Sequence, residues 1–242
     1  MVKSTSRNAE QEAIRTRDCW AAKNSALRAD RARSFAVQKA LAQDDTEKES
    51  GFMKPSTASR LSITPVTRRG SETRVIFLVG FMGAGKTTVG QALARRLGWQ
   101  FEDLDEKIQA REAQTIEQIF RVAGEAAFRA VEQETIQELL SNLGASCQIV
   151  ALGGGAFTQA ANADAIRRSG FPVVFLDAPV EELWQRCQNQ PTNRPLRRNL
   201  EQFRDLYQAR RPHYMTAGLR VETEGKDIEA VAAEVACSLG LL

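Results

Sequence analysis

Residues 80–87 (GFMGAGKT) combine residue types that bind the phosphates of a nucleotide. Gly80, Gly85, Lys86 and Thr87 match the spacing G-x-x-x-x-G-K-[ST]. Glycines allow backbone amides to approach phosphate oxygens, and the N-terminus of a following helix favours an anion. In such a loop Lys86 would neutralise the β- and γ-phosphates, and Thr87 would ligate Mg²⁺. The motif predicts binding of a nucleoside triphosphate but leaves the phosphate acceptor open.

Two carboxylates follow this loop. Asp103 and Asp105 lie two residues apart at the end of a predicted strand, so extended geometry would project both from one face. One could hold Mg²⁺ through water, while the other orients a hydroxyl nucleophile and accepts its proton. The alternative is a pair of solvated acids, one of which caps a helix. Asp177 also ends an apolar segment, VVFLD, but the pair after the loop helix is the better metal candidate.

Three further features could bind the acceptor. Arg129 and Glu132 are three residues apart on a predicted helix, where Glu132 could brace the guanidinium to grip a carboxylate. The alternative is a surface ion pair worth about 0.2–0.5 kcal/mol. The glycines at 153–155 end an apolar strand, where ligands of parallel sheets bind, unless they form only a tight turn. Arg194 and Arg210 lie in polar segments and could close over nucleotide or substrate, or be solvated surface charges.

Alternating strands and helices would position these residues. Buried strands are predicted at residues 75–80, 99–105, 147–155, 172–179 and 219–223. Helices are predicted at residues 86–98 with Gly98 as C-cap, 115–142 with a break or bend near Gly124, 164–169, 180–190, from 200 to the proline at 212, and 227–240. This alternation predicts an α/β fold with a parallel sheet covered on both faces.

Charge divides the chain into two parts. Residues 1–70 hold 14 basic and 8 acidic side chains, whereas residues 71–242 hold 19 basic and 22 acidic ones. The first part is predicted to be a basic extension, disordered or partly helical, and the second to be the folded domain. A mildly acidic domain argues against broad nucleic-acid binding. A cleaved plastid transit peptide and a translation start at Met53 remain open, although the extension is rich in acid for a transit peptide.

Composition argues against several other classes of site and location. The four cysteines are scattered and His213 is the single histidine, which argues against a disulfide framework, a zinc site or a Ser-His-Asp triad. Residues 1–15 lack the apolar core of a signal peptide, and no apolar run is long enough for a bilayer. A cytoplasmic location is therefore predicted.

The order and spacing of these motifs resemble those of shikimate kinase over roughly residues 74–242. The resemblance rests on GFMGAGKTTVG, DLD, IEQIFRVAGEAAFRAVEQE, GGG, NRPL and RRPHY, taken in this order. It implies a P-loop kinase fold, with a five-stranded parallel sheet sandwiched by helices and a mobile lid. It also implies a monomer that uses ATP and Mg²⁺ to phosphorylate the 3-hydroxyl of shikimate, on the pathway to aromatic amino acids, without nucleic-acid or membrane partners.

The resemblance also implies roles for individual residues. The implied ATP-binding residues are Gly83, Ala84, Gly85, Lys86, Thr87, Thr88 and Arg194. The implied metal residues are Thr87 and Asp103, with Asp103 acting through water. The implied substrate-binding residues are Asp105 at the hydroxyl, Arg129 and Arg210 at the carboxylate, and Gly154 through its backbone. The implied catalytic residues are Lys86, Asp105 and the lid arginine Arg194.

Two other functions remain open from the sequence. A related small-molecule kinase could phosphorylate gluconate or a nucleoside monophosphate, and Trp99, Phe128 or Trp184 could then bind a base. A non-catalytic relative could bind nucleotide and serve a partner through the basic extension. Offering shikimate, gluconate and AMP separately in an ADP-release assay would discriminate among these functions.

Overall fold

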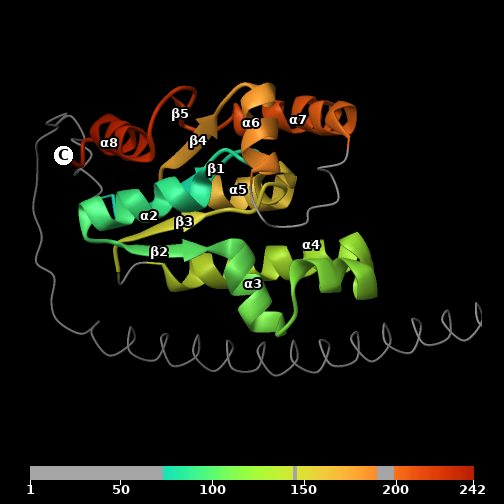
Figure 1. The fold of residues 1–242 in the computed structure, drawn as a ribbon. Helices are drawn as coiled ribbons and strands as arrows, with labels where there is room; N and C mark the ends of the chain where they lie inside the picture. Colours follow the sequence, from blue (N-terminus) through green and yellow to red (C-terminus); the bar gives the residue numbers. More distant parts are fainter. Residues whose placement is uncertain (1–72, 144–145, 190–198) are drawn as a thin grey trace, which may run out of the picture. The chain divides into compact units, whose positions relative to one another are not determined.

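The computed structural model describes residues 73–143, 146–189 and 199–242 (Figure 1). The predicted boundary at residue 70 and the lid arginine Arg194 lie outside these residues. Five parallel strands form a sheet in the order β2-β3-β1-β4-β5. The strands are β1 (Val75–Val79), β2 (Gln100–Asp103), β3 (Gln148–Ala151), β4 (Val173–Asp177) and β5 (Leu219–Glu222). The predicted five-stranded parallel sheet is confirmed.

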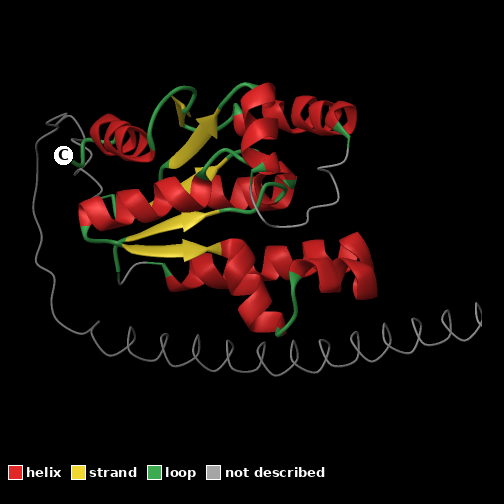
Figure 2. Cartoon of the chain, in the orientation of Figure 1, coloured by secondary structure: helices red, strands yellow, loops and turns green. Residues whose placement is uncertain are grey.

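Helices flank this sheet (Figure 2). They are α2 (Lys86–Leu97), α3 (Leu104–Glu112), α4 (Ile116–Asn142), α5 (Ala160–Arg168), α6 (Val180–Gln188), α7 (Leu200–Tyr214) and α8 (Ile228–Ser238), with a 3-10 turn η1 (Ala156–Thr158). All five residues of β1 and of β4 are buried. Successive side chains of a strand face opposite sides, so both faces of the central sheet are covered. Among the helices of the described ranges, none combines the length and the apolar composition of a transmembrane span.

The strand register brings three chain segments to one edge of the sheet. Ala151 of β3 pairs with Leu78 of β1 on one side and with Asp103 of β2 on the other. Because all three strands run in the same direction, the residues that follow them emerge at the same edge. Three segments therefore begin side by side: the phosphate-loop motif, α3 and the glycine turn at residues 153–155.

Two predicted features of the helices are confirmed. α2 ends at Gly98, which adopts φ 68° and donates its N–H to the carbonyl of Ala94. A residue other than glycine would be strained in this left-handed conformation. α4 is bent at Gly124, whose φ of 83° and ψ of 176° are non-helical. Gly124 therefore divides α4 into two helical segments.

Several predicted element boundaries are wrong. The strand predicted at residues 147–155 ends at Ala151, and the helix predicted at residues 164–169 begins at Ala160. The strand predicted to reach residue 105 ends at Asp103, and α3, which the sequence indicated only through the alternative of a helix-capping acid, begins at Leu104. The cause is a cap: the Asp103 carboxylate accepts a hydrogen bond of 2.9 Å from the backbone N–H of Asp105. α7 was predicted to stop at Pro212 but continues to Tyr214. A proline this close to the C-terminus of a helix removes one N–H donor and leaves the preceding turns intact.

Candidate active site

The phosphate-loop motif forms a tight turn between β1 and α2. Gly80 has φ 148° and Gly83 has φ 81°. A methyl group at Gly80 would lie 2.6 Å from the carbonyl oxygen of Leu176, and one at Gly83 would lie 2.7 Å from that of Leu183. Side chains are therefore excluded at both positions, because the loop packs directly on neighbouring backbone. This packing fixes the loop at the N-terminus of α2, where backbone N–H groups favour an anion.

Lys86 is the first residue of α2, and its side chain curls over the loop. Its Nζ donates hydrogen bonds of 3.0 Å to the carbonyl oxygens of both Gly80 and Phe81. These contacts hold the ammonium group against the first residues of the loop. A positive charge in that place can interact with phosphates that the backbone amides bind.

Thr87 and Asp103, the two residues considered for a metal, are in direct contact. Thr87 Oγ1 donates a hydrogen bond of 2.8 Å to Asp103 Oδ2, while Asp103 Oδ1 caps α3. A hydroxyl and a carboxylate are oxygen donors of the kind that Mg²⁺ prefers, and Mg²⁺ commonly adds water and substrate phosphates to one or two such groups. In the part of the chain that the structure describes, no group of three or more His, Cys, Asp or Glu residues could hold a metal ion. The site therefore fits an ion held jointly with a nucleotide.

Asp177, the other acid considered for the metal, has different hydrogen-bond partners from Asp103. Its carboxylate accepts hydrogen bonds from Arg211 Nη2 at 2.7 Å, Arg220 Nε at 2.9 Å and the Tyr207 hydroxyl at 3.2 Å. These bonds join β4, β5 and α7, and the Asp177 side chain is only 4% exposed. Asp177 therefore stabilises the fold, and the geometry favours Asp103 as the metal carboxylate.

Three predicted substrate residues meet at the glycine turn after β3. A methyl group at Gly153 would lie 2.5 Å from Asp105 Oδ1, and one at Gly155 would lie 2.6 Å from Arg129 Nη1. One at Gly154 would lie 3.8 Å from Arg210 Nη1 and also 3.8 Å from the backbone nitrogen of Met82 in the phosphate loop. Asp105, Arg129 and Arg210 come from α3, α4 and α7, so three separate elements converge on this turn.

Arg129 is held by two glutamates. Its Nη1 donates to Glu132 Oε2 at 2.9 Å, and its Nη2 and Nε donate to Glu125 Oε1 at 3.1 and 3.3 Å. The guanidinium also lies 5.2 Å from the centre of the Phe128 ring. Glu132 is only 1% exposed, so the pair is not the surface ion pair of the alternative interpretation. Sequence reasoning missed Glu125, although its position four residues before Arg129 is a signal for such a pair.

Glu132 is an unusual carboxyl group in this setting. Burial raises the pKa of Glu132 above its ordinary value, Arg129 opposes this shift, and the neighbouring charge of Asp105 adds to it. Glu132 therefore lies within electrostatic reach of both the proposed carboxylate anchor and the proposed hydroxyl-orienting residue.

Tyr214 is a second residue that sequence reasoning missed. It is fully buried at the end of α7, and its hydroxyl donates a hydrogen bond to the carbonyl oxygen of Gly154. It follows Arg210 by four residues, so both side chains lie on the same face of α7. That spacing within RRPHY could have indicated a link to Arg210.

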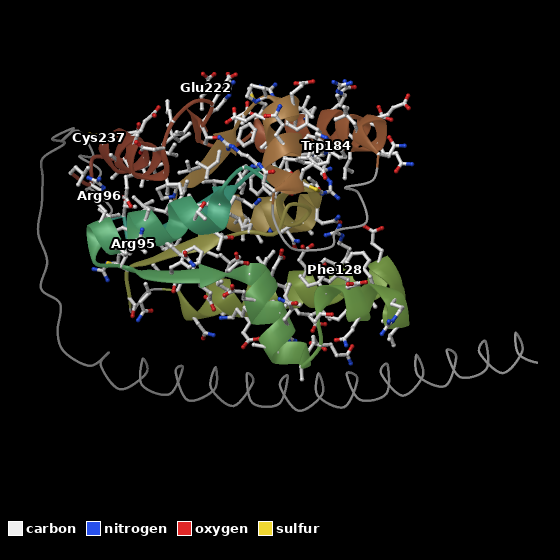
Figure 3. The ribbon with its side chains drawn as sticks, in the orientation of Figure 1. Arg95, Arg96, Phe128, Trp184, Glu222 and Cys237 are labelled. Atoms are coloured by element: carbon white, nitrogen blue, oxygen red, sulfur yellow. The ribbon has the colours of Figure 1, made fainter. Side chains whose placement is uncertain are left out.

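Two of the three aromatic residues considered for base binding lie on separate helices, whereas Trp99 lies between α2 and β2. Phe128 comes from α4 and Trp184 from α6 (Figure 3). Phe128 is buried, and its ring centre lies 4.7 Å from that of Phe120. Trp184 packs edge-on against Phe203, with ring centres 5.1 Å apart. Both rings therefore have packing partners in the protein, and Phe128 also lies beside Arg129.

A shallow pocket of about 470 Å³ borders the last residue of the phosphate loop. Its lining residues come from α2 and from the start of α8: Thr88, Gln91, Arg95, Asp227, Ile228 and Glu229. Figure 3 labels Arg95 on α2. None of Asp105, Arg129 and Arg210 lines this pocket, so it is not part of the turn where these three residues meet.

Comparisons with known proteins point to one family. The family model described as "Shikimate kinase" matches residues 82–239. The chain is 36% identical to a shikimate kinase from Persephonella marina over 162 residues, covering 67% of this chain and 96% of the relative. It is 41% identical to one from Geobacter sulfurreducens over 168 residues, covering 69% and 91%. A solved shikimate kinase from Acinetobacter baumannii, in complex with shikimate, superposes with a TM-score of 0.64 at 37% identity, covering 70% and 94%.

Proposed function

The chain belongs to the shikimate kinase family, and from this premise we propose how its residues carry out the family's reaction. The chain is an ATP-dependent kinase that converts shikimate to shikimate 3-phosphate, on the pathway to chorismate and the aromatic amino acids. One observation supports our assignment of residues above all others. Asp105, Arg129 and Arg210 surround a bare glycine turn that borders the phosphate loop.

The phosphate loop and α2 would bind ATP. Backbone amides of residues 83–88 would surround the phosphates, and Lys86 would neutralise the charge that develops on the transferring group. ATP use implies a divalent metal, which we take to be Mg²⁺ held through Thr87 and, by way of water, Asp103. When bound, this ion would neutralise phosphate charge. Arg194, outside the described residues, would close over the phosphates from a lid.

The turn at 153–155 would bind shikimate. Shikimate carries one carboxylate and three hydroxyls. Its binding therefore requires guanidinium groups for the carboxylate, an acceptor for a hydroxyl proton and exposed backbone donors. Arg129 and Arg210 would bind the carboxylate, and the backbone of Gly154 would contact the ring substituents. With the ring fixed in this way, Asp105 would face the 3-hydroxyl.

The chemical step would then depend mainly on position. The 3-hydroxyl oxygen forms a bond to the γ-phosphorus, and the bond from that phosphorus to the β–γ bridging oxygen breaks as ADP leaves. Asp105 would orient the hydroxyl and accept its proton. Holding the two reactants in line converts a bimolecular encounter into a step within one complex. Exclusion of water would prevent hydrolysis of ATP in place of transfer.

We propose four further properties with this function. The enzyme acts as a monomer, in the cytoplasm, and without nucleic-acid or membrane partners. Residues 1–70 form an extension separate from the kinase domain. Light scattering of the purified protein tests whether it is a monomer, and cell fractionation tests its location. The kinetics of a chain that begins at residue 71 test whether the kinase domain functions without the extension. A dimer mass, a membrane-bound fraction or an inactive truncated chain would each contradict the corresponding property.

An ADP-release assay tests the proposed acceptor. With shikimate, gluconate and AMP offered separately, we expect ADP release with shikimate and a product that mass spectrometry identifies as shikimate 3-phosphate. Lys86→Met serves as the matched control, because it removes one charge at similar length and should abolish turnover while the fold remains intact. ADP release with gluconate or AMP in place of shikimate would overturn the proposed function.

A further inference from the structure

Two groups that we assign to the acceptor, the backbone at Gly154 and the guanidinium of Arg210, share Tyr214 as a neighbour. We propose that Tyr214 is a positioning residue: its hydroxyl holds the Gly154 peptide and Arg210 together in the orientation that binds shikimate. This inference rests on the proposed function and deepens it. Tyr214 would act through these two groups and would not touch the substrate.

The hydroxyl of Tyr214 links two segments that are 60 residues apart in the chain. It donates a hydrogen bond to the carbonyl oxygen of Gly154. The peptide bonds of the described residues are trans. In a trans peptide the C=O and N–H groups point in opposite directions, so the bond to Tyr214 turns the N–H of Gly155 away from the tyrosine. The Gly154 carbonyl is therefore held by a hydroxyl group on α7, whereas the carbonyls of Gly153 and Gly155 accept from the backbone N–H groups of Ala156 and Thr158.

The same hydroxyl also lies within electrostatic reach of Arg210. The charge of Arg210 opposes the rise in the pKa of the Tyr214 hydroxyl, and Arg210 Nη1 would lie 3.8 Å from a methyl group on Gly154. Arg210 carries only donors, and the tyrosine oxygen keeps acceptor capacity while its hydrogen goes to Gly154. Tyr214, Gly154 and Arg210 are therefore neighbours whose polar groups are complementary.

The ring of Tyr214 is fixed by its surroundings. It is fully buried and packs against Phe175 of β4, with ring centres 5.4 Å apart and planes inclined by 33°. Burial, with only partial opposition from Arg210, raises the pKa of the Tyr214 hydroxyl to about 12. The group therefore stays protonated at neutral pH and remains a donor to Gly154.

The chain offers a matched control on the same helix. Its two tyrosines are Tyr207 and Tyr214, and both lie on α7. The Tyr207 hydroxyl lies 3.2 Å from a backbone carbonyl oxygen, that of Ala178, and also 3.2 Å from Asp177 Oδ1, so these two acceptors share its single hydrogen. Tyr207→Phe and Tyr214→Phe therefore remove the same atom from the same helix, but only the second removes a bond to the acceptor turn.

The kinetic test measures both substrates for wild type and for the two variants. For Tyr214→Phe we expect KM for shikimate to rise about tenfold, the effect of losing one hydrogen bond to a buried carbonyl, while KM for ATP changes less than about twofold. Tyr207→Phe should leave both KM values within about twofold. A Tyr214→Phe enzyme with an unchanged KM for shikimate, or with equal losses for ATP and shikimate, would overturn the positioning role.

A spectroscopic test does not depend on the stability of Tyr214→Phe. Protein labelled with 3-fluorotyrosine should show two ¹⁹F resonances, which the Tyr207→Phe variant assigns because it retains only Tyr214. Saturating shikimate should shift the Tyr214 resonance and leave that of Tyr207 in place. An active protein whose Tyr214 resonance does not respond to shikimate overturns this inference alone, whereas a wild type without shikimate-dependent ADP release overturns the proposed function as well.

Discussion

The guanidinium of Arg129 lies directly against the backbone of Gly155. A methyl group on Gly155 would lie 2.6 Å from Nη1 and 2.7 Å from Nη2 of Arg129. Gly155 has φ −104° and ψ −13°, which any residue can adopt, so its backbone conformation does not demand glycine. The close approach of Arg129 explains the glycine, and Glu125 and Glu132 hold the guanidinium there through their carboxylates.

The first prediction is that Gly155→Ala impairs substrate binding by Arg129, although the arginine itself is not substituted. The methyl group must displace the guanidinium, because a contact of 2.6 Å is not tolerated. We expect kcat/KM for shikimate to fall about tenfold or more, as for partial loss of a charge-assisted contact, with KM for ATP unchanged. Gly218→Ala is the control, since a methyl there would meet only the Val173 carbonyl at 3.9 Å. Equal kinetics for the two variants would show that Arg129 need not occupy its place beside the turn.

The second prediction concerns Glu132 and pH. The pKa of Glu132 is raised, chiefly by burial and despite its bond to Arg129, so folding disfavours the ionised form. The stability associated with this group is therefore fully present below its unfolded pKa and is lost as pH rises through the raised folded pKa. Glu132→Gln, which is neutral throughout, lacks this dependence. Thermal unfolding of both proteins is measured between pH 4 and 8. The Tm of Glu132→Gln minus that of wild type should increase as pH rises. A decrease in this difference would contradict the prediction.

The third prediction separates the two tasks of Asp103. Asparagine can still cap α3 through Oδ1, and its Nδ2 can donate to the Thr87 hydroxyl oxygen in place of accepting from it, but it lacks the negative charge. Asp103→Asn should therefore retain the wild-type Tm to within a few degrees. The concentration of Mg²⁺ for half-maximal activity should rise about tenfold to a hundredfold, as when a metal's supporting carboxylate is lost. Wild-type Mg²⁺ dependence in this variant would remove Asp103 from the metal site.

Much of the fold follows from local sequence. The apolar segments VIFLV and VVFLD predict buried strands because a strand covered on both faces must be apolar throughout. Glycine at position 98 predicts the end of α2 because the left-handed C-cap favours glycine. The start of α3 was missed, because only Leu104 and Ile108 of this helix are buried and the apolar periodicity is correspondingly weak.

The site was less predictable than the fold. Residue types and spacing identified the phosphate loop and made Arg129 and Arg210 candidates, and the resemblance supplied the role of both arginines at the carboxylate. Sequence could not show that Gly153 and Gly155 are needed because Asp105 and Arg129 lie against them, since this depends on contacts between distant segments. For the same reason the bond from Tyr214 to Gly154 could not be predicted. Asp177 was a plausible metal ligand until its bonds to Arg211 and Arg220 were known.

The most direct test of the account measures what Arg129 recognises. The kcat/KM values of wild type and Arg129→Ala are compared for shikimate and for its carboxamide, which has the same shape but no negative charge. If Arg129 binds the carboxylate, the substitution should cost on the order of 1.5–3 kcal/mol with shikimate and less than about 0.5 kcal/mol with the carboxamide. Equal losses with the two substrates, or a loss below about 0.5 kcal/mol with shikimate, would contradict the central claim that the glycine turn binds the acceptor by its carboxylate.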